Sequence, residues 1–145
     1  HYEDIIAVRV KKIFPDPVWK RRYKHVLDFE SMLAEEGTVI IKLFLNISKE
    51  EQKKRLESRL QDPDKLWKFC MDDLDDRNRW DEFQTAYQDL IEKTSTPEAP
   101  WYIIPADRKW YRNLVVARLM VEKLRHLQLS LPTPNFDPAS IIIPD

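Results

Sequence analysis

The sequence predicts an α/β fold that is mostly helical and contains two parallel strands. Apolar residues recur every three or four positions over most of the chain, which is typical of amphipathic helices. Two short runs, TVIIKLFL at 38–45 and WYII at 101–104, are rich in β-branched and aromatic residues and do not alternate, as expected of buried parallel strands. The resulting order of elements is helix, helix, strand, helix, helix, strand, helix, with connections long enough for right-handed parallel crossovers.

The first half of the chain is expected to contain two helices and a strand. The first helix covers about residues 2–10 and ends before the sequence FPDP at 14–17, in which the prolines break the helical pattern. A second helix follows to about Glu36, and Gly37 is suited to the left-handed conformation that ends many helices. The strand at 38–45 comes next, with Lys42 as the one exception to its apolar run.

The second half begins with a very polar helix over 49–61, opened by Ser48 and Glu51 in the pattern of a capping box. A connector over 62–69 precedes a long helix over about 72–93. After a turn and the strand at 101–104, a last helix over 111–128 is expected to face inward with Leu114, Ala117, Val121 and Leu124. The tail from residue 131 is rich in proline and is expected to be irregular.

Composition narrows the class of protein. The 145 residues suit a single domain, and 24 Lys and Arg against 25 Asp and Glu argue against a nucleic-acid binder. We see no apolar run long enough for a membrane span and no signal peptide, so we expect no membrane partner and a cytoplasmic location.

The sequence begins without Met, directly in a helical pattern, and two strands alone leave a parallel sheet uncovered. We therefore expect the chain to be part of a longer protein.

Glycine content excludes the common phosphate-binding loops from this chain. A Walker A loop needs two glycines and a Rossmann loop needs three, because their backbone N–H groups wrap a phosphate closely. The chain has one glycine, Gly37, which is expected at a helix end. Neither loop can be formed by these residues.

Cations are concentrated between residues 49 and 68, where seven Lys and Arg stand against five acids. Arg55 and Arg59 lie four positions apart, on one face of the predicted helix, and could present two guanidinium groups to one polyanion. The alternative is a solvated helix face with ordinary surface ion pairs, and composition alone favours that alternative.

Three other features have both a functional and a structural interpretation. Arg77 interrupts an apolar stripe and needs either a phosphate or an acid such as Asp73 or Asp81. The adjacent Glu3 and Asp4 could hold Mg²⁺, or could simply complement a helix dipole, which is the commoner case. Trp67 and Trp80 could stack on a base, although core packing is the commoner role of tryptophan. No histidine or cysteine spacing indicates a metal site, so the metal ligands stay unknown.

Several strings occur together in a familiar order. They are HYED at 1–4, FESMLAEEG at 29–37, FLNISKEEQKKRLESRL at 44–60, DPDKLWKF at 62–69, DRNRWDEFQTAY at 76–87 and TSTPEAPWYIIPADRKWYRNLVVAR at 94–118. In this order they resemble the polyphosphate kinase 2 family, which transfers phosphoryl groups between inorganic polyphosphate and nucleotides. The resemblance implies the C-terminal part of a three-layer P-loop kinase fold, related to thymidylate kinases, without its Walker A region. Residues 1–128 would form this partial domain, with a helical lid at about 49–72, and residues 129–145 an irregular tail.

The resemblance also implies site residues and ligands. Catalytic roles would fall to Glu3, Asp4, Arg9 and Arg55. Substrate-binding roles would fall to Arg59, Lys65, Lys68, Arg77, Asp107 and Lys109. Mg²⁺ would be the cofactor, polyphosphate and AMP or ADP the substrates, and the longer protein is expected to be a homo-oligomer.

The implied reaction is in-line phosphoryl transfer, which depends on positioning and charge neutralisation. Because the Walker lysine and its loop are absent, we expect these 145 residues to be inactive alone. Two alternatives remain at this point: an ATP-dependent nucleoside monophosphate kinase, and a non-catalytic helical module whose basic helix binds an acidic partner.

A first prediction concerns folding. Expressed alone, the chain should be poorly soluble or lack fixed packing, because its two strands have no further strands beside them. Thermal unfolding followed by near-UV circular dichroism should then show no sharp transition. A sharp, cooperative transition of the isolated monomer would contradict this prediction.

Overall fold

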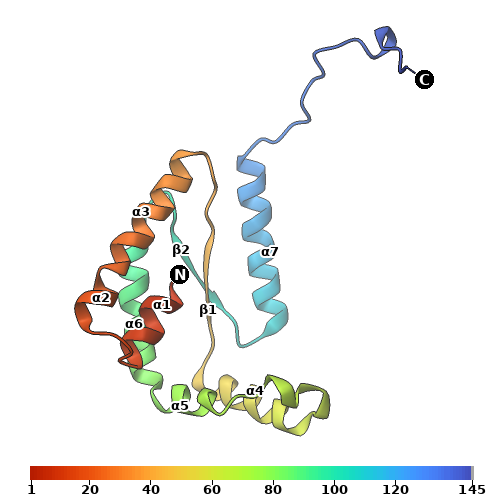
Figure 1. Cartoon of the computed structure of the whole chain (residues 1–145). Coiled ribbons are helices and arrows are strands. Elements are labelled where there is room, and N and C mark those ends of the chain that lie inside the picture. Colours follow the sequence, from red (N-terminus) through yellow and green to blue (C-terminus); the bar gives the residue numbers. More distant parts are fainter. Residues whose placement is uncertain (145) are drawn as a thin grey trace.

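The computed structural model describes residues 1–144 and confirms a mostly helical α/β arrangement with two parallel strands (Figure 1). The elements in order are α1 (Glu3–Val10), α2 (Asp16–Lys20), α3 (Arg22–Glu35), β1 (Lys42–Asn46), α4 (Lys49–Gln61), η1 (Pro63–Lys68), α5 (Asp72–Asn78), α6 (Trp80–Thr94), β2 (Trp101–Pro105), α7 (Lys109–His126) and η2 (Pro138–Ser140). In Figure 1, α1, α2, α3 and α6 lie to one side of the strands and α7 lies to the other. No helix within residues 1–144 combines the length and apolar character required to cross a membrane.

The two strands pair in parallel over their whole length, from Lys42 opposite Trp101 to Asn46 opposite Pro105. The expected strand at 38–45 therefore begins too early, since residues 38–41 are not part of the ladder. A strand is defined by its hydrogen-bonded partner, and β2 begins at Trp101. The β-branched run was correctly located, but its first half has no strand beside it in the described chain.

Two of the predicted helices are each divided by one arginine. Arg21 separates α2 from α3, and it keeps nearly helical angles of φ −66° and ψ −21°. Arg79 separates α5 from α6 with φ −99° and ψ 26°, and its Nη1 donates to the carbonyl of Val10 at 3.0 Å. These breaks change helix direction without proline or glycine, so the apolar period continues across them and does not reveal them.

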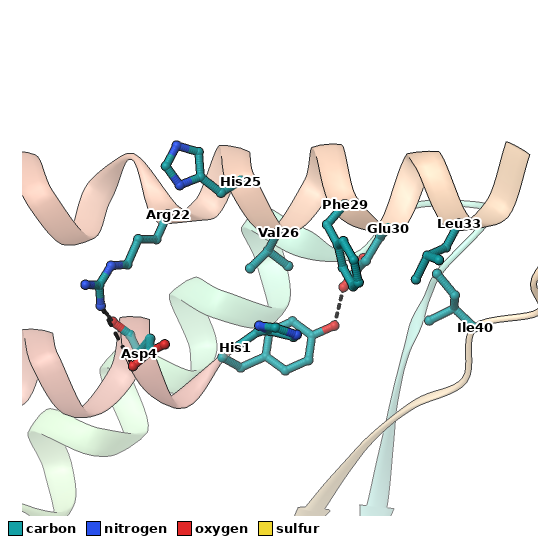
Figure 2. Close-up of a pocket in the computed structure, with 10 residues that line it drawn as sticks. His1, Asp4, Arg22, His25, Val26, Phe29, Glu30, Leu33 and Ile40 are labelled. Carbon is teal, nitrogen blue, oxygen red and sulfur yellow. Dashed lines mark hydrogen bonds and ion pairs between the residues drawn. The ribbon is translucent and has the colours of Figure 1, made fainter.

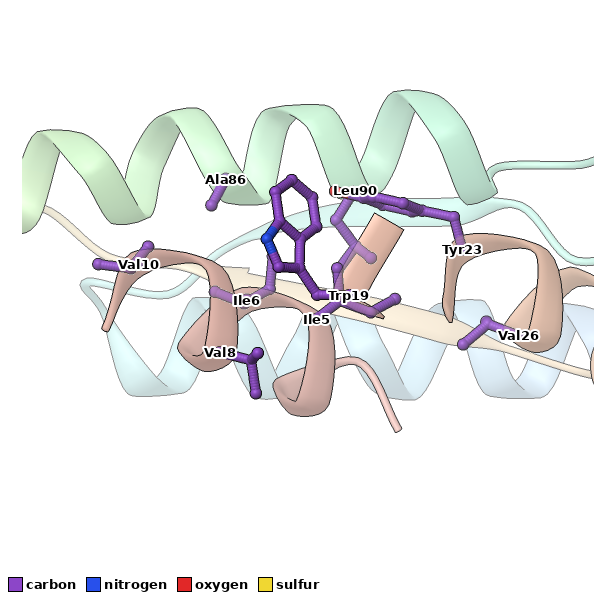
Figure 3. Packing of buried hydrophobic residues seen from close by; sticks show 9 residues of the cluster. All are labelled: Ile5, Ile6, Val8, Val10, Trp19, Tyr23, Val26, Ala86 and Leu90. Carbon is purple, nitrogen blue, oxygen red and sulfur yellow. The ribbon is translucent and has the colours of Figure 1, made fainter. Parts of the chain in front are cut away.

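The hydrophobic core lies where α1 packs between α3 and α6 (Figure 3). Ile5, Ile6, Val8 and Val10 are buried although they cover more than one face of the short helix α1. A helix that is apolar on most sides needs covering on most sides, which explains why α1 lies inside the packed helices. Trp19, Tyr23 and Val26 from α2 and α3, and Ala86 and Leu90 from α6, complete the cluster.

A polar network is buried beside this core, centred on the ammonium group of Lys42. Its Nζ lies 2.7 Å from Glu30 Oε2 and donates at 2.5 Å to the carbonyl of Thr94. The Lys42 and Glu30 side chains are only 3% and 7% exposed. Tyr2 donates its hydroxyl to the other oxygen of Glu30, and burial, followed by this contact with the carboxylate, strongly raises the Tyr2 pKa. Trp101 donates its indole N–H to Thr94 Oγ1 at 2.8 Å.

Helix α7 is oriented differently from the expectation. Leu114, Val121 and Leu124, which were expected to face inward, are between 40% and 50% exposed. The helix contacts β2 through its other side, where Lys123 Nζ lies 5.5 Å from the centre of the Tyr102 ring. The apolar period identified the helix correctly, but α7 is apolar on two sides and only one of them is covered here.

The buried ion pair generates a stability prediction. Lys42→Met leaves the Glu30 carboxylate without its cation and should lower the free energy of unfolding by about 3–5 kcal/mol. The measurement is urea unfolding of the longer polypeptide that carries this sequence. The control is the double variant Lys42→Met/Glu30→Leu, which removes both charges and should recover much of the loss. A Lys42→Met protein as stable as the parent would contradict the prediction.

Candidate functional site

The carboxyl ends of β1 and β2 form one edge of the sheet, and the chain arranges polar groups there. Asn46 and Pro105 are paired at this edge, and Ala106 N donates to the Asn46 carbonyl at 2.8 Å as the next contact. In open parallel sheets this edge is where ligands bind. A cavity of about 650 Å³ opens here between the loops that follow the two strands, and its walls include Lys49, Trp80, Arg108 and Tyr111.

A second, smaller cavity of about 310 Å³ adjoins the first, and Asn46, Ile47, Trp80 and Gln84 line both. Its remaining wall includes Phe44 from β1 and Tyr87 from α6. Burial raises the pKa of Tyr87, and the negative charges of Glu3 and Asp76 raise it further. The two cavities therefore adjoin each other at this edge of the sheet, and both aromatic and polar side chains line them.

The first turn of α4 is tied to the loop after β2. Ser48 Oγ accepts from the Glu51 N–H at 3.1 Å, which confirms half of the expected capping box. The other half is different, because the Ser48 N–H donates to Asp107 Oδ1 at 2.8 Å instead of to Glu51. Glu51 Oε1 instead accepts from Arg55 Nε at 2.8 Å.

Arg55 adds a second tie between α4 and the same loop. Its Nη2 donates to the carbonyls of Ala106 and Asp107 at 2.7 and 3.3 Å. The donated Ser48 N–H holds the Asp107 pKa below its usual value, and the charges of Arg55 and Lys54 act in the same direction. The contacts of Ser48, Arg55 and Asp107, called here the α4 clasp, fix the base of α4 at the rim of the larger cavity.

Arg77 joins α5 to the base of α4. Its Nη1 donates to the Lys49 carbonyl at 2.7 Å and to Gln52 Oε1 at 2.9 Å. The sequence suggested an acid or a phosphate as the partner, whereas the structure places a carbonyl and an amide there. Asp73 instead lies 3.5 Å from Arg59 Nη1. The arginines of α4 and α5 thus hold the two helices together as a hairpin.

The far end of this hairpin is exposed, and its two lysines stand against Asp62 and Asp64. Lys65, on η1, contacts Asp62 just before it, and Lys68 Nζ lies 4.9 Å from the centre of the Trp67 ring. Trp67 is 78% exposed, so the expectation of core packing is wrong for this residue. Its indole N–H donates to the Asp64 carbonyl at 3.0 Å, which holds the ring in one orientation.

Glu3 and Asp4 are directed to different surroundings, since neighbouring residues on a helix point about 100° apart. The negative charge of Glu3 contributes, after burial, to the raised pKa of Tyr87, but Glu3 itself does not line the smaller edge cavity. Asp4 lines a separate cavity of about 350 Å³ between α1 and α3, where Arg22 Nη1 donates to its backbone carbonyl at 2.5 Å (Figure 2). The two carboxylates therefore face different surroundings, and neither lines the edge cavities.

Arg9 and Lys109 lie apart from the α4 clasp. Arg9 Nη1 is 2.6 Å from Asp89 Oδ2, and its guanidinium lies 5.3 Å from the centre of the Trp19 ring, so it links α1 to α6 and α2. Lys109 is the exposed first residue of α7. Their expected roles in catalysis and substrate binding stay predictions.

Sequence reasoning missed most of the residues that line the edge cavities. Trp80 was weighed as a base-stacking residue but core packing was favoured, and Gln84 and Asn46 carried no signal of their own. Arg108 and Tyr111 fall within the string PADRKWYRN, which was singled out for Asp107 and Lys109 alone. A stricter application of the rule that ligands bind beyond the carboxyl ends of parallel strands would have included Asn46 and Arg108.

The carboxylates of the described chain were tested as a metal site. No group of three or more His, Cys, Asp or Glu side chains comes together within residues 1–144 to hold an ion. Mg²⁺ in phosphoryl-transfer enzymes is commonly held by one or two carboxylates together with substrate phosphates. Glu3 fits such a role as a single ligand, whereas the divergent Asp4 does not complete a pair with it.

Comparison with known proteins decides the family. The family model described as polyphosphate kinase 2 matches residues 1–131. The chain belongs to the polyphosphate kinase 2 family. The solved structure of polyphosphate kinase 2 from Arthrobacter aurescens TC1 is 47% identical, with a TM-score of 0.89 over 96% of this chain and 49% of that chain. The three-layer P-loop kinase architecture expected from the resemblance is therefore confirmed as the fold to which this chain contributes.

Curated relatives of the polyphosphate kinase 2 family give the same result. A protein from Meiothermus ruber named "AMP/ADP-polyphosphate phosphotransferase" is 52% identical over 143 residues, or 99% of this chain and 54% of that protein. An "ADP-polyphosphate phosphotransferase" from Rhodopseudomonas palustris is 35% identical, covering 91% of this chain and 50% of that protein. The chain thus spans about half the length of these two relatives.

The contact between Ser48 and Asp107 in the α4 clasp predicts how the Asp107 carboxyl titrates. Because the Asp107 pKa is lowered, its carboxylate should keep the Ser48 contact at every pH above the ordinary aspartate value of about 3.9. The contact, and the stability it contributes, should be lost only as the pH falls through the lower value of the folded protein. An NMR pH titration of the Asp107 carboxyl measures this midpoint.

Two variants of Ser48 separate the effect of its backbone N–H on the Asp107 pKa from the effect of its side chain. Ser48→Pro removes the backbone donor, and the φ of −73° at this position suits proline. It should return the Asp107 midpoint toward the ordinary value. Ser48→Ala keeps the backbone N–H and should shift the midpoint less. Equal midpoints in the two variants would show that the backbone N–H is not the main cause.

Proposed function

We propose that the longer polypeptide carrying this chain transfers phosphoryl groups between inorganic polyphosphate and nucleotides of the AMP or ADP type. The proposal is supported by membership of the polyphosphate kinase 2 family and by relatives that are named for transfer between polyphosphate and AMP or ADP. A relative from Pseudomonas syringae, 34% identical over 123 residues, is named "Polyphosphate:AMP phosphotransferase". These 145 residues would supply one part of that enzyme.

The observation that carries the proposal is the position of the α4–α5 hairpin. Its base is clasped to the rim of the larger edge cavity, and its basic side chains continue outward from that rim. Polyphosphate is a long polyanion, so it needs cations along its length rather than one closed pocket. The excess of cations lies on α4 and η1, where seven Lys and Arg stand against five acids over 49–68, whereas α5 carries four aspartates and one arginine. The track would therefore be formed by α4 and η1, beside the larger edge cavity.

The reaction breaks one phosphoanhydride P–O bond of polyphosphate and forms one P–O bond to an acceptor oxygen of the nucleotide phosphate. Polyphosphate leaves shorter by one phosphoryl group, and no electrons are exchanged. The transition state carries its charge on the equatorial oxygens of the transferring group. Residues of this chain would therefore act by positioning and by neutralising that charge.

Roles follow from the position of each side chain. The Nη1 of Arg55 makes no hydrogen bond within residues 1–144, so this part of the guanidinium would contact the transferring group at the cavity rim. Arg59, Lys65 and Lys68 would bind successive phosphates of the donor. Lys109 would add a cation beyond Arg108, and Asp107 would position α4 through the clasp. Arg77 would act through α4 rather than by touching the substrate.

The remaining substrate and cofactor groups are assigned to the longer polypeptide. A phosphate-binding loop cannot come from a chain with one glycine, so that loop would be supplied outside these residues. Mg²⁺ would neutralise phosphate charge when bound, with Glu3 as the carboxylate of this chain that fits a ligand role. The homo-oligomeric state and the cytoplasmic location stay predictions.

The decisive experiment is a donor assay on the longer polypeptide, with AMP or ADP as acceptor and either long-chain polyphosphate or ATP as phosphoryl donor. We expect product with polyphosphate. An enzyme that works with ATP and gains nothing from polyphosphate would be an ordinary nucleoside monophosphate kinase and would contradict the proposal.

The roles proposed for Arg55 and Arg59 are tested in the same donor assay. Replacing both Arg55 and Arg59 by Ala should lower kcat/KM for polyphosphate by about 10³-fold or more, since a charge-stabilising arginine is worth that much in phosphoryl transfer. Lys53→Ala is the matched control, because Lys53 lies on the same helix and is paired with Glu57 at the surface. It should change kcat/KM by less than about twofold. Full activity in the double variant would refute the assigned roles.

A further inference from the structure

Helix α5 is held by polar contacts rather than by the hydrophobic core. Within residues 1–144, none of its seven residues is buried, and its one large apolar side chain, Leu74, is 38% exposed. Apolar burial therefore contributes little to the orientation of this helix. The contacts of Arg77 and Asp73 with α4 join the two limbs of the hairpin to each other. They do not attach α5 to the rest of the fold.

The attachment of α5 to the rest of the fold lies at the C-terminal end of α1. Lys11 Nζ is 2.8 Å from Asp76 Oδ1, and both side chains are 35% exposed. This contact raises the pKa of Lys11, and the negative charge of Asp72 acts in the same direction, so one lysine faces two aspartates of α5. Arg79, at the break between α5 and α6, donates to the Val10 carbonyl at 3.0 Å. These contacts of Lys11 and Arg79 are called here the α5 tether.

The backbone at the end of α1 explains why a carbonyl is available there. Lys12 has the left-handed φ of 54°, and Ile13 N donates to the Val8 carbonyl at 3.1 Å, as in a Schellman motif. The chain therefore leaves the helix, and the Val10 carbonyl loses the donor that a further turn would have supplied. A helix C-terminus carries partial negative charge, which makes the guanidinium of Arg79 a favourable partner for this carbonyl.

The α5 tether affects the candidate site because α5 forms part of its wall. Asp73 and Asp76 line the smaller edge cavity, so Asp76 is both a wall residue and the partner of Lys11. A shift of α5 would move this wall. Through the contacts of Arg77 and Asp73 with α4, it would also move the cations of α4 and η1. Both contacts of the tether are made between residues of this chain, so they require no uncovered surface.

We propose that Lys11 and Arg79 are positioning residues for polyphosphate binding. They hold α5 against the end of α1 and thereby set the direction of the track formed by α4 and η1 relative to the larger edge cavity. This role in binding rests on the function proposed above, whereas the holding of α5 can be measured without any substrate. Neither residue lines the edge cavities, so both act through α5 rather than by touching the polymer.

Hydrogen exchange of the longer polypeptide measures how firmly α5 is held. In Lys11→Met/Arg79→Met, the backbone amides of residues 72–78 should exchange about tenfold faster, because a helix without buried residues loses its main attachment. The amides of residues 86–94, in the buried half of α6, should keep their rates. Lys12→Met is the matched control, since Lys12 is an exposed lysine of the same turn, and it should leave α5 unchanged. Unchanged exchange of α5 in the double variant, or equal acceleration in both helices, would overturn the proposal.

The donor assay then measures the consequence for substrate binding. In the double variant, KM for polyphosphate should rise about tenfold, because a small misplacement of a binding element is costly. The kcat at saturating polyphosphate should fall less than about threefold, because the groups at the transferring phosphate are unchanged. Lys11→Arg/Arg79→Lys keeps both cations and should recover most of the loss in KM and in exchange protection.

Two results separate this proposal from the proposed function. Faster exchange of α5 with an unchanged KM would overturn the role of Lys11 and Arg79 in binding. Absence of product from polyphosphate in the parent protein would refute the phosphoryl-transfer function itself. The exchange result would then decide by itself whether these two residues hold α5.

Discussion

The buried contact of Lys42 with Glu30 is the constraint on which the packing of this chain depends. Removing two charges from water costs several kcal/mol per ion, and the cost is offset only when every donor and acceptor is satisfied. Here Tyr2, Thr94 and the face of Trp101 complete the surroundings of the pair. These five residues come from the residue before α1, from α3 and β1, from the end of α6 and from the start of β2. The arrangement fixes how the helices sit on the sheet more precisely than the apolar core can, because hydrogen bonds are directional and apolar contacts are not.

Most of the fold could be predicted because its helices have a clear apolar period and its strands a distinct composition. The exceptions have identifiable physical reasons. The start of β1 depends on where β2 begins, and the turns at Arg21 and Arg79 cost too little backbone energy to need a special residue. Lys42 could be seen only as an irregularity in an apolar run, since its partner Glu30 lies on another element. The inward face of α7 was misjudged because the helix has two apolar faces and the sequence does not say which one meets the strands.

The candidate site was predictable at the level of segments and not of contacts. The basic region at 49–68 and Asp107 were both singled out, and the structure brings Asp107 to the first turn of α4. The pairs that do so are far apart in the sequence, as with Ser48 and Asp107 or Arg77 and Lys49. Long side chains such as arginine reach several ångströms beyond their helix, so their partners depend on tertiary packing. The lid at about 49–72 and its cations stay predictions from the family resemblance, whereas Gln84 and Tyr111 are recognised as lining residues only once both strand ends are in place.

The α4–α5 hairpin is held at one end and open at the other. Its root is fastened by Asp107, Arg55 and Arg77, while the indole of Trp67 is exposed at the tip. A hairpin that is fixed at one end is most constrained at that end. Side chains close to the root are therefore held by contacts with the loop after β2, whereas the tip presents an exposed indole. One element can in this way combine an accurately placed base with an outer end that is free to contact other molecules.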